Sequence, residues 1–141
     1  MGIDLSQFRE IFLKESFEGL DVMESSLLSL DAGDSNPETV NTIIRAAHSI
    51  KGGSATFGFS NVAEFTHVLE TLLDQVYSEE RDVSREVIKA LLQSVDCVRG
   101  MLSAERDGSD YDEARVQTVL QNLKAMLGMT DDGESDEQTA M

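Results

Sequence analysis

Apolar side chains recur at intervals of three and four residues along most of the chain, and short polar stretches interrupt them. This spacing places the apolar side chains on one face of an α-helix, whereas a β-strand would alternate them at every second residue. An aromatic content of 6% and a single proline also favour helices over sheets. We therefore expect an all-α fold, an antiparallel up-down four-helix bundle with a fifth C-terminal helix. The expected helices cover residues 4–30, 37–57, 61–78, 84–104 and 111–127, and the third could also begin at Ser60.

Capping residues indicate where some of these helices begin. The second helix has two possible caps: Asn36 followed by Pro37 at the first helical position, or a box formed by Ser35 and Glu38. Asp110 is placed to cap the fifth helix. These signals predict sharp helix starts and short connections, as an up-down bundle requires.

The balance of charge excludes two classes of partner. The chain has 27 acidic and 11 basic residues, a formal net charge of −16. Nucleic-acid binding needs a basic surface, and an acidic protein is repelled by anionic lipids, so we expect no nucleic acid and no direct membrane contact. No apolar run approaches the ~20 residues of a membrane span, and no signal-peptide pattern is present. Cys97 is the single cysteine and has no disulfide partner within the chain, which fits a cytoplasmic protein. We expect its side chain to point away from the apolar face of its helix and its thiol to have a structural role.

Composition divides the chain into one domain and a tail. Residues 1–128 hold all of the helical periodicity and are long enough for a single core. Residues 129–141 are acidic, small and polar without periodicity, so we interpret them as a disordered tail or a linker.

One stretch of the second helix carries most of the visible chemistry. Lys51 follows His48 by three residues, and Gly52 and Gly53 come directly after it. His48 and Gly52 lie on nearly the same face of a helix, and His48 sits on the shoulder of the buried stripe, where its edge meets water. Each glycine costs roughly 1 kcal/mol relative to alanine inside a helix. We therefore expect both glycines to leave clearance for a large partner, with Lys51 near any anion on the imidazole.

Two simpler interpretations compete with a reactive His48 that a large partner approaches. His48 could be an exposed helical histidine without a role, or His48, His67 and Glu70 could bind a metal ion. Di-metal bundles use several inward glutamates and two Glu-x-x-His pairs, whereas this chain has two histidines in all and a His-x-x-Glu spacing. We therefore expect no metal site.

The stretch 46–53 resembles the histidine phosphotransfer (HPt) domain family, and most nearly the N-terminal domain of chemotaxis sensor histidine kinases. The likeness extends without obvious gaps over residues 4–74 and more loosely to residue 128. Ala55 departs from the pattern, because many members have glycine there. Further residues that carry the resemblance are Thr56-Phe57-Gly58-Phe59, then Thr66-His67, Glu70 and Leu72-Leu73-Asp74, and near the start Asp4, Phe8, Phe12 and Glu15.

The resemblance implies a role for each polar residue of the motif. His48 would be phosphorylated on Nε2, which is nucleophilic when the neutral ring keeps its proton on Nδ1. Glu70 would accept that Nδ1 proton in a hydrogen bond and so orient and activate the ring. Lys51 would stabilise the phosphoryl charge, and His67 would tune the hydrogen-bond network around the site.

The resemblance also implies a phosphoryl relay in two-component chemotaxis signalling. His48 would take the γ-phosphoryl group of ATP from a histidine kinase catalytic domain and pass it to an aspartate of a response regulator. The chain has no Walker-type glycine loop, so it would be the phosphoryl-carrier domain of a transferase without an ATP site of its own. ATP and Mg²⁺ would belong to the kinase domain, and a second Mg²⁺ to the chemotaxis-type receiver domain. No cofactor would be bound by residues 1–128.

The implied kinase domain belongs to the same protein and acts in trans within a dimer. Residues 129–141 would then begin the linker to it, and the full-length protein would be cytoplasmic at membrane receptor arrays. Two alternatives remain open. One is a free-standing HPt protein in a multistep phosphorelay, and the other is a non-catalytic helical binding module in which His48 is inert.

Overall fold

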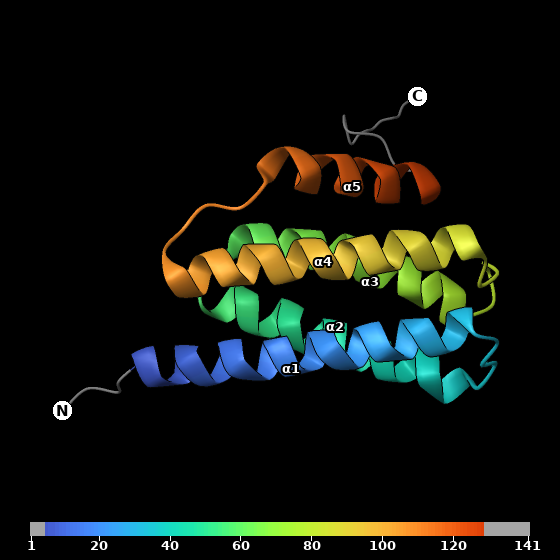
Figure 1. Cartoon of the computed structure of the whole chain (residues 1–141), viewed down its shortest axis with the longest axis horizontal. Coiled ribbons are helices and arrows are strands. Elements are labelled where there is room, and N and C mark those ends of the chain that lie inside the picture. Colours follow the sequence, from blue (N-terminus) through green and yellow to red (C-terminus); the bar gives the residue numbers. More distant parts are fainter. Residues whose placement is uncertain (1–4, 129–141) are drawn as a thin grey trace, which may run out of the picture.

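The computed structural model describes residues 5–128, and these contain helices and turns but no strand. Successive helices run in opposite directions along one long axis (Figure 1). Helix α1 packs against α2 and α4, α3 also packs against α2 and α4, and α5 covers α3 and α4. Within the described residues the backbones of the diagonal pairs, α1 with α3 and α2 with α4, do not come close, so the first four helices form a closed ring around one core. The expected up-down bundle with a fifth helix is confirmed. The helices are α1 (Leu5–Asp31), α2 (Pro37–Thr56), α3 (Ser60–Tyr77), α4 (Arg85–Asp107) and α5 (Glu113–Met126).

The core consists of the apolar stripes that the periodicity predicts. Helices α1 and α2 meet at Gly19 and Ala46, where a Cβ added to the glycine would make an ordinary contact of 3.8 Å with the Cβ of Ala46. Phe8 falls within the apolar pattern of the first helix, but it is 53% exposed. Side chains that are completely buried include Leu20, Leu27, Leu72, Leu102 and Leu123.

Of the caps predicted for α2 and α5, one is confirmed and one is wrong, and α3 begins after Phe59 without a side-chain cap. Asn36 caps α2 by accepting a hydrogen bond from the backbone N–H of Glu38, and Pro37 takes the first helical position. Helix α5 is capped by Asp112, which accepts from the backbone N–H of Arg115. The predicted cap Asp110 lies too early, because the loop runs two residues further before the backbone becomes helical.

The expectation for Cys97 is also wrong. Its side chain is only 3% exposed, and burial raises the pKa of its thiol. Helix α5 covers the side of α4 that carries Cys97, and the charges of Arg115 and Asp112 from the α5 region reach the thiol. Four helices alone would leave Cys97 exposed, and the fifth helix makes it part of the core. The tail, residues 129–141, and the proposed cap Asp4 lie outside the described residues.

Candidate functional site

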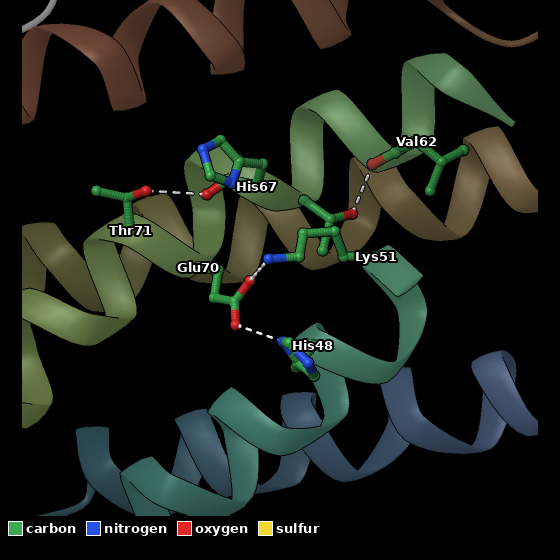
Figure 2. Close-up of polar contacts among 7 residues, drawn as sticks. His48, Lys51, Val62, His67, Glu70 and Thr71 are labelled. Atoms are coloured by element: carbon green, nitrogen blue, oxygen red, sulfur yellow. Dashed lines mark hydrogen bonds and ion pairs between the residues drawn. The ribbon is translucent and has the colours of Figure 1, made fainter. Parts of the chain in front are cut away.

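Helices α2 and α3 form a hairpin that brings the polar residues of the motif together. Gly58 adopts a φ of 77° in the short turn, a conformation that side chains disfavour. The turn places α3 antiparallel to α2, so Glu70 of α3 lies opposite the middle of α2. Figure 2 shows that the Glu70 carboxylate lies between His48 and Lys51. Glu70 Oε2 is 3.0 Å from His48 Nδ1, and Glu70 Oε1 is 2.6 Å from Lys51 Nζ.

Exposure differs sharply between His48 and Glu70. His48 is 69% exposed, whereas Glu70 is only 12% exposed. Burial acts to raise the pKa of Glu70, but the hydrogen bonds and positive charges of Lys51 and His48 outweigh it and lower the pKa below its ordinary value. Glu70 is therefore ionised near neutral pH and has no proton to donate.

The ionised carboxylate fixes which ring nitrogen of His48 carries a proton. A carboxylate can only accept a hydrogen bond, so the 3.0 Å contact requires a proton on Nδ1 of His48. In the neutral ring the free lone pair then belongs to Nε2. Because Glu70 holds the Nδ1 edge and the side chain is mostly exposed, Nε2 is the nitrogen open to a reactant.

The sequence did not specify the contacts that Lys51 and His67 make in the structure. Lys51 pairs with Glu70 in this structure, so its contact with a phosphoryl group stays a prediction. His67 lies on the exposed side of α3, one turn before Glu70, and Figure 2 shows its ring directed away from the carboxylate. Its backbone carbonyl accepts a hydrogen bond from Thr71 Oγ1, but within residues 5–128 its imidazole makes no bond to the other site residues. The structure does not bring His67 into the network, and its role there stays a prediction.

The two glycines differ in what surrounds them. A Cβ added at Gly52 would meet nothing within 4 Å, which fits the predicted clearance for a partner. A Cβ added at Gly53 would lie 2.1 Å from the ring of Phe12 in α1. That ring stacks on Phe57 with centroids 5.5 Å apart. Partner clearance is therefore the wrong explanation for Gly53, because the space beside it is filled by the chain's own aromatic cluster.

Two other properties bear on the alternatives. In the part of the chain that the structure describes, no three His, Cys, Asp or Glu side chains are grouped so that they could hold a metal ion. None of the helices in that part has the length and apolar character needed to cross a membrane.

Comparison with known proteins identifies the family. The family model of the Hpt domain matches residues 7–132. The chain is 43% identical over 124 residues to the chemotaxis protein CheA of Rhizobium meliloti, covering 88% of this chain and 16% of the relative. It is 41% identical over 126 residues to CheA of Klebsiella aerogenes, covering 89% of this chain and 19% of the relative. The chain therefore spans less than a fifth of the length of these relatives.

Solved structures agree with the sequence relatives. The phosphorylated P1 domain of CheA3 in complex with CheY6, from R. sphaeroides, is similar with a TM-score of 0.78 and 25% identity, over 86% of this chain and 96% of that one. The CheA phosphotransferase domain of Thermotoga maritima is similar with a TM-score of 0.67 and 28% identity, over 74% of this chain and 99% of that one. With a family model that covers most of its length, this chain belongs to the histidine phosphotransfer (Hpt) domain family.

Proposed function

We propose that this chain is the phosphoryl-carrying domain of a CheA-type chemotaxis histidine kinase, with His48 as the carrier. The observation that supports it best is the 3.0 Å contact between His48 Nδ1 and Glu70 Oε2. This contact holds the proton on Nδ1 and leaves Nε2 as an exposed nucleophile. The sequence relatives and the structural neighbours named CheA support the signalling context.

In the first step, the lone pair of His48 Nε2 attacks the γ-phosphorus of ATP. The bond between that phosphorus and the β,γ-bridging oxygen breaks, and ADP leaves with the electron pair. The ring becomes cationic as the N–P bond forms, and the ionised Glu70 stabilises this charge through Nδ1–H. Lys51 adds positive charge to the region while it remains paired with Glu70.

In the second step, a carboxylate oxygen of a receiver aspartate attacks the same phosphorus. The N–P bond breaks and its electron pair returns to Nε2, which restores the neutral ring with its proton on Nδ1. The R. sphaeroides neighbour was solved phosphorylated and in complex with CheY6, which supports a receiver of the chemotaxis type as the acceptor.

The remaining parts of the reaction belong to other domains. The relatives are more than five times as long as the matched region, which supports a kinase domain elsewhere in the same protein. By the family resemblance, we expect that domain to act in trans within a dimer. That domain would hold ATP and Mg²⁺, and the receiver would hold its own Mg²⁺. Residues 1–128 would form the phosphotransfer domain and residues 129–141 the start of the linker. The full-length protein would be cytoplasmic, at receptor arrays.

Phosphorylation of wild type and His48→Gln by the matching kinase fragment, with labelled ATP, tests this function. We expect label that is acid-labile and alkali-stable on wild type and none on His48→Gln. If wild type takes no label, phosphorylated receiver domains should be offered next. Label from those donors alone would replace the proposal with a free-standing protein of a multistep phosphorelay. No label from either source would reduce the domain to a non-catalytic binding module.

A further inference from the structure

A phosphoryl group on His48 needs a cation in direct contact, and Lys51 is already engaged. Its Nζ lies 2.6 Å from Glu70 Oε1. If Lys51 moved to the phosphoryl group, Glu70, which is only 12% exposed, would lose this ion pair and keep only its hydrogen bond to the ring, which is less favourable for the carboxylate. A cation that is free in the resting structure is therefore better placed to bind the phosphoryl group.

Arg45 is such a cation. It is exposed on α2, and within residues 5–128 its guanidinium has no hydrogen bond, ion pair or ring contact. This is unusual in a chain with a net charge of −16, where carboxylates are abundant. Hydrogen bonds or ion pairs hold most other arginines of the described part, namely Arg9, Arg81, Arg99, Arg106 and Arg115.

Arg45 and Lys51 flank His48 on opposite sides. Each is three residues from His48, a spacing that places Cβ atoms roughly 5–6 Å apart on neighbouring parts of a helix surface. Lys51 lies on the side toward α3, where it meets Glu70. Arg45 lies on the other side, one turn toward the start of α2. Glu70 holds the Nδ1 edge of the ring, so Nε2 is the nitrogen left free. The long arginine side chain can therefore reach a group attached to Nε2.

The local charges favour an anion beside Arg45. The charges of Lys51 and Glu70 cancel as a pair, and His48 is neutral in its reactive form. Within the described residues no ion pair joins Arg45 to a carboxylate. Arg45 is thus an uncompensated positive charge, and its planar fork can bind two phosphoryl oxygens at once.

We propose that Arg45 binds the phosphoryl oxygens on His48 directly, while Lys51 stays with Glu70 and helps to orient the imidazole. This inference rests on the proposed phosphorylation of His48. The two cations then have different roles. Arg45 contacts the transferred group, whereas Lys51 acts on it only through Glu70 and at a distance.

The test compares Arg45→Gln with Arg85→Gln, both phosphorylated by the matching kinase fragment and ATP. Arg85 is a fair control because it is also exposed and unpaired within residues 5–128, and it begins α4, which does not touch α2. Loss of one charge-assisted hydrogen bond should slow labelling of Arg45→Gln about tenfold or more. Labelling of Arg85→Gln should match wild type, and Arg45→Lys should recover part of the rate.

A second measurement separates contact with the phosphoryl group from docking of the kinase. The ³¹P resonance of the phosphorylated domain is followed against pH in wild type and Arg45→Gln. A bound arginine favours the dianion, so its removal should move the titration midpoint to higher pH. An unchanged midpoint would overturn the proposal, even if labelling were slow, because Arg45 would then act on the partner alone. Absence of label on wild type would instead refute the proposed function itself.

Discussion

Helices α2 and α4 each carry an exposed glycine in their interior, yet only one of the two adjoins a candidate site. A Cβ added at Gly52 or at Gly100 would meet nothing within 4 Å. Glycine destabilises a helix interior by roughly 1 kcal/mol relative to alanine in both places. Open space beside a costly glycine is therefore not by itself a sign of function.

What differs is the residue one turn earlier. His48 precedes Gly52 by four residues and bonds to Glu70 across the bundle at 3.0 Å. Asp96 precedes Gly100 by four residues and pairs with Arg115 of α5 at 3.4 Å, with both side chains exposed. The α2 region thus combines clearance with an oriented nucleophile, whereas the α4 region combines the same clearance with a weak surface ion pair.

The largest expected effect comes from filling the space beside each glycine. Gly52→Gln should lower phosphoryl transfer by about a hundredfold or more, because the new side chain occupies the approach to Nε2 and misplacement of reacting groups by about 1 Å is costly. Gly100→Gln should leave transfer unchanged. Both should raise the free energy of unfolding by roughly 0.5–1 kcal/mol, since glutamine is the better helix former. Transfer rates and denaturant unfolding measure the two effects.

This pair of variants can also contradict the proposed difference between Gly52 and Gly100. Normal transfer by Gly52→Gln would mean that no partner approaches this face closely. Equal loss of transfer in both variants would point to a general effect of helix rigidity, and clearance would no longer explain Gly52.

The next effect distinguishes the carboxylates of Glu70 and Asp96. Glu70→Ala should slow phosphorylation by roughly 10- to 100-fold, because the imidazole loses the acceptor that fixes its tautomer and a charged hydrogen bond worth about 1.5–3 kcal/mol. Asp96→Ala should leave the rate unchanged. Circular dichroism should show equal helicity for both. If Glu70→Ala is phosphorylated as fast as wild type, orientation by Glu70 is not part of the reaction.

The fold could be predicted from the sequence because it depends on local spacing. Apolar periodicity fixes the buried face of each helix, and Pro37 after Asn36 marks the start of α2. The contact between His48 and Glu70 was implied by the family resemblance, and the α2–α3 hairpin forms it.

The errors arise where a distant segment decides the environment. Cys97 is buried because α5 packs over it, which periodicity within α4 does not reveal. Gly53 faces the ring of Phe12, a residue forty-one positions earlier. The pairing of Lys51 with Glu70 depends on side-chain geometry between two helices. Sequence spacing alone therefore did not show which negatively charged group Lys51 contacts. Phe12 beside Gly53 is the contact that analysis of α2 by itself could not find.

A smaller effect, on stability, follows from Gly53. Gly53→Ala should destabilise the domain by roughly 1–3 kcal/mol despite the better helix propensity of alanine, because its Cβ would overlap the Phe12 ring. Combined with Phe12→Leu, which shortens the obstructing side chain, the same change should cost less. Denaturant unfolding of the four proteins in a double-mutant cycle measures this coupling. Additive costs would show that the clash with Phe12 is not what requires glycine.

The smallest expected effect is a dependence of stability on pH that Glu70, between α2 and α3, causes. Burial acts to raise the pKa of Glu70, but Lys51 and His48 outweigh it, so the folded state lowers this pKa below its ordinary value of 4.5. A lowered carboxyl pKa stabilises the fold above the unfolded pKa, and this stabilisation is lost as pH falls through the folded pKa. Glu70→Gln should therefore be less stable than wild type at neutral pH, and the two unfolding free energies should converge below pH 4.5.

Lys51→Gln provides the matched background for this measurement. Among the groups that lower the pKa of Glu70, Lys51 acts most strongly, so in its absence the effect of Glu70→Gln on stability should depend less on pH. Chemical unfolding at several pH values, with and without Glu70→Gln in both backgrounds, gives the two differences. An identical pH dependence with and without Lys51 would show that the ion pair at 2.6 Å does not stabilise the ionised carboxylate in solution. The proposed difference in role between Lys51 and Arg45 would then lose its structural basis, because Lys51 would be free to meet the phosphoryl group.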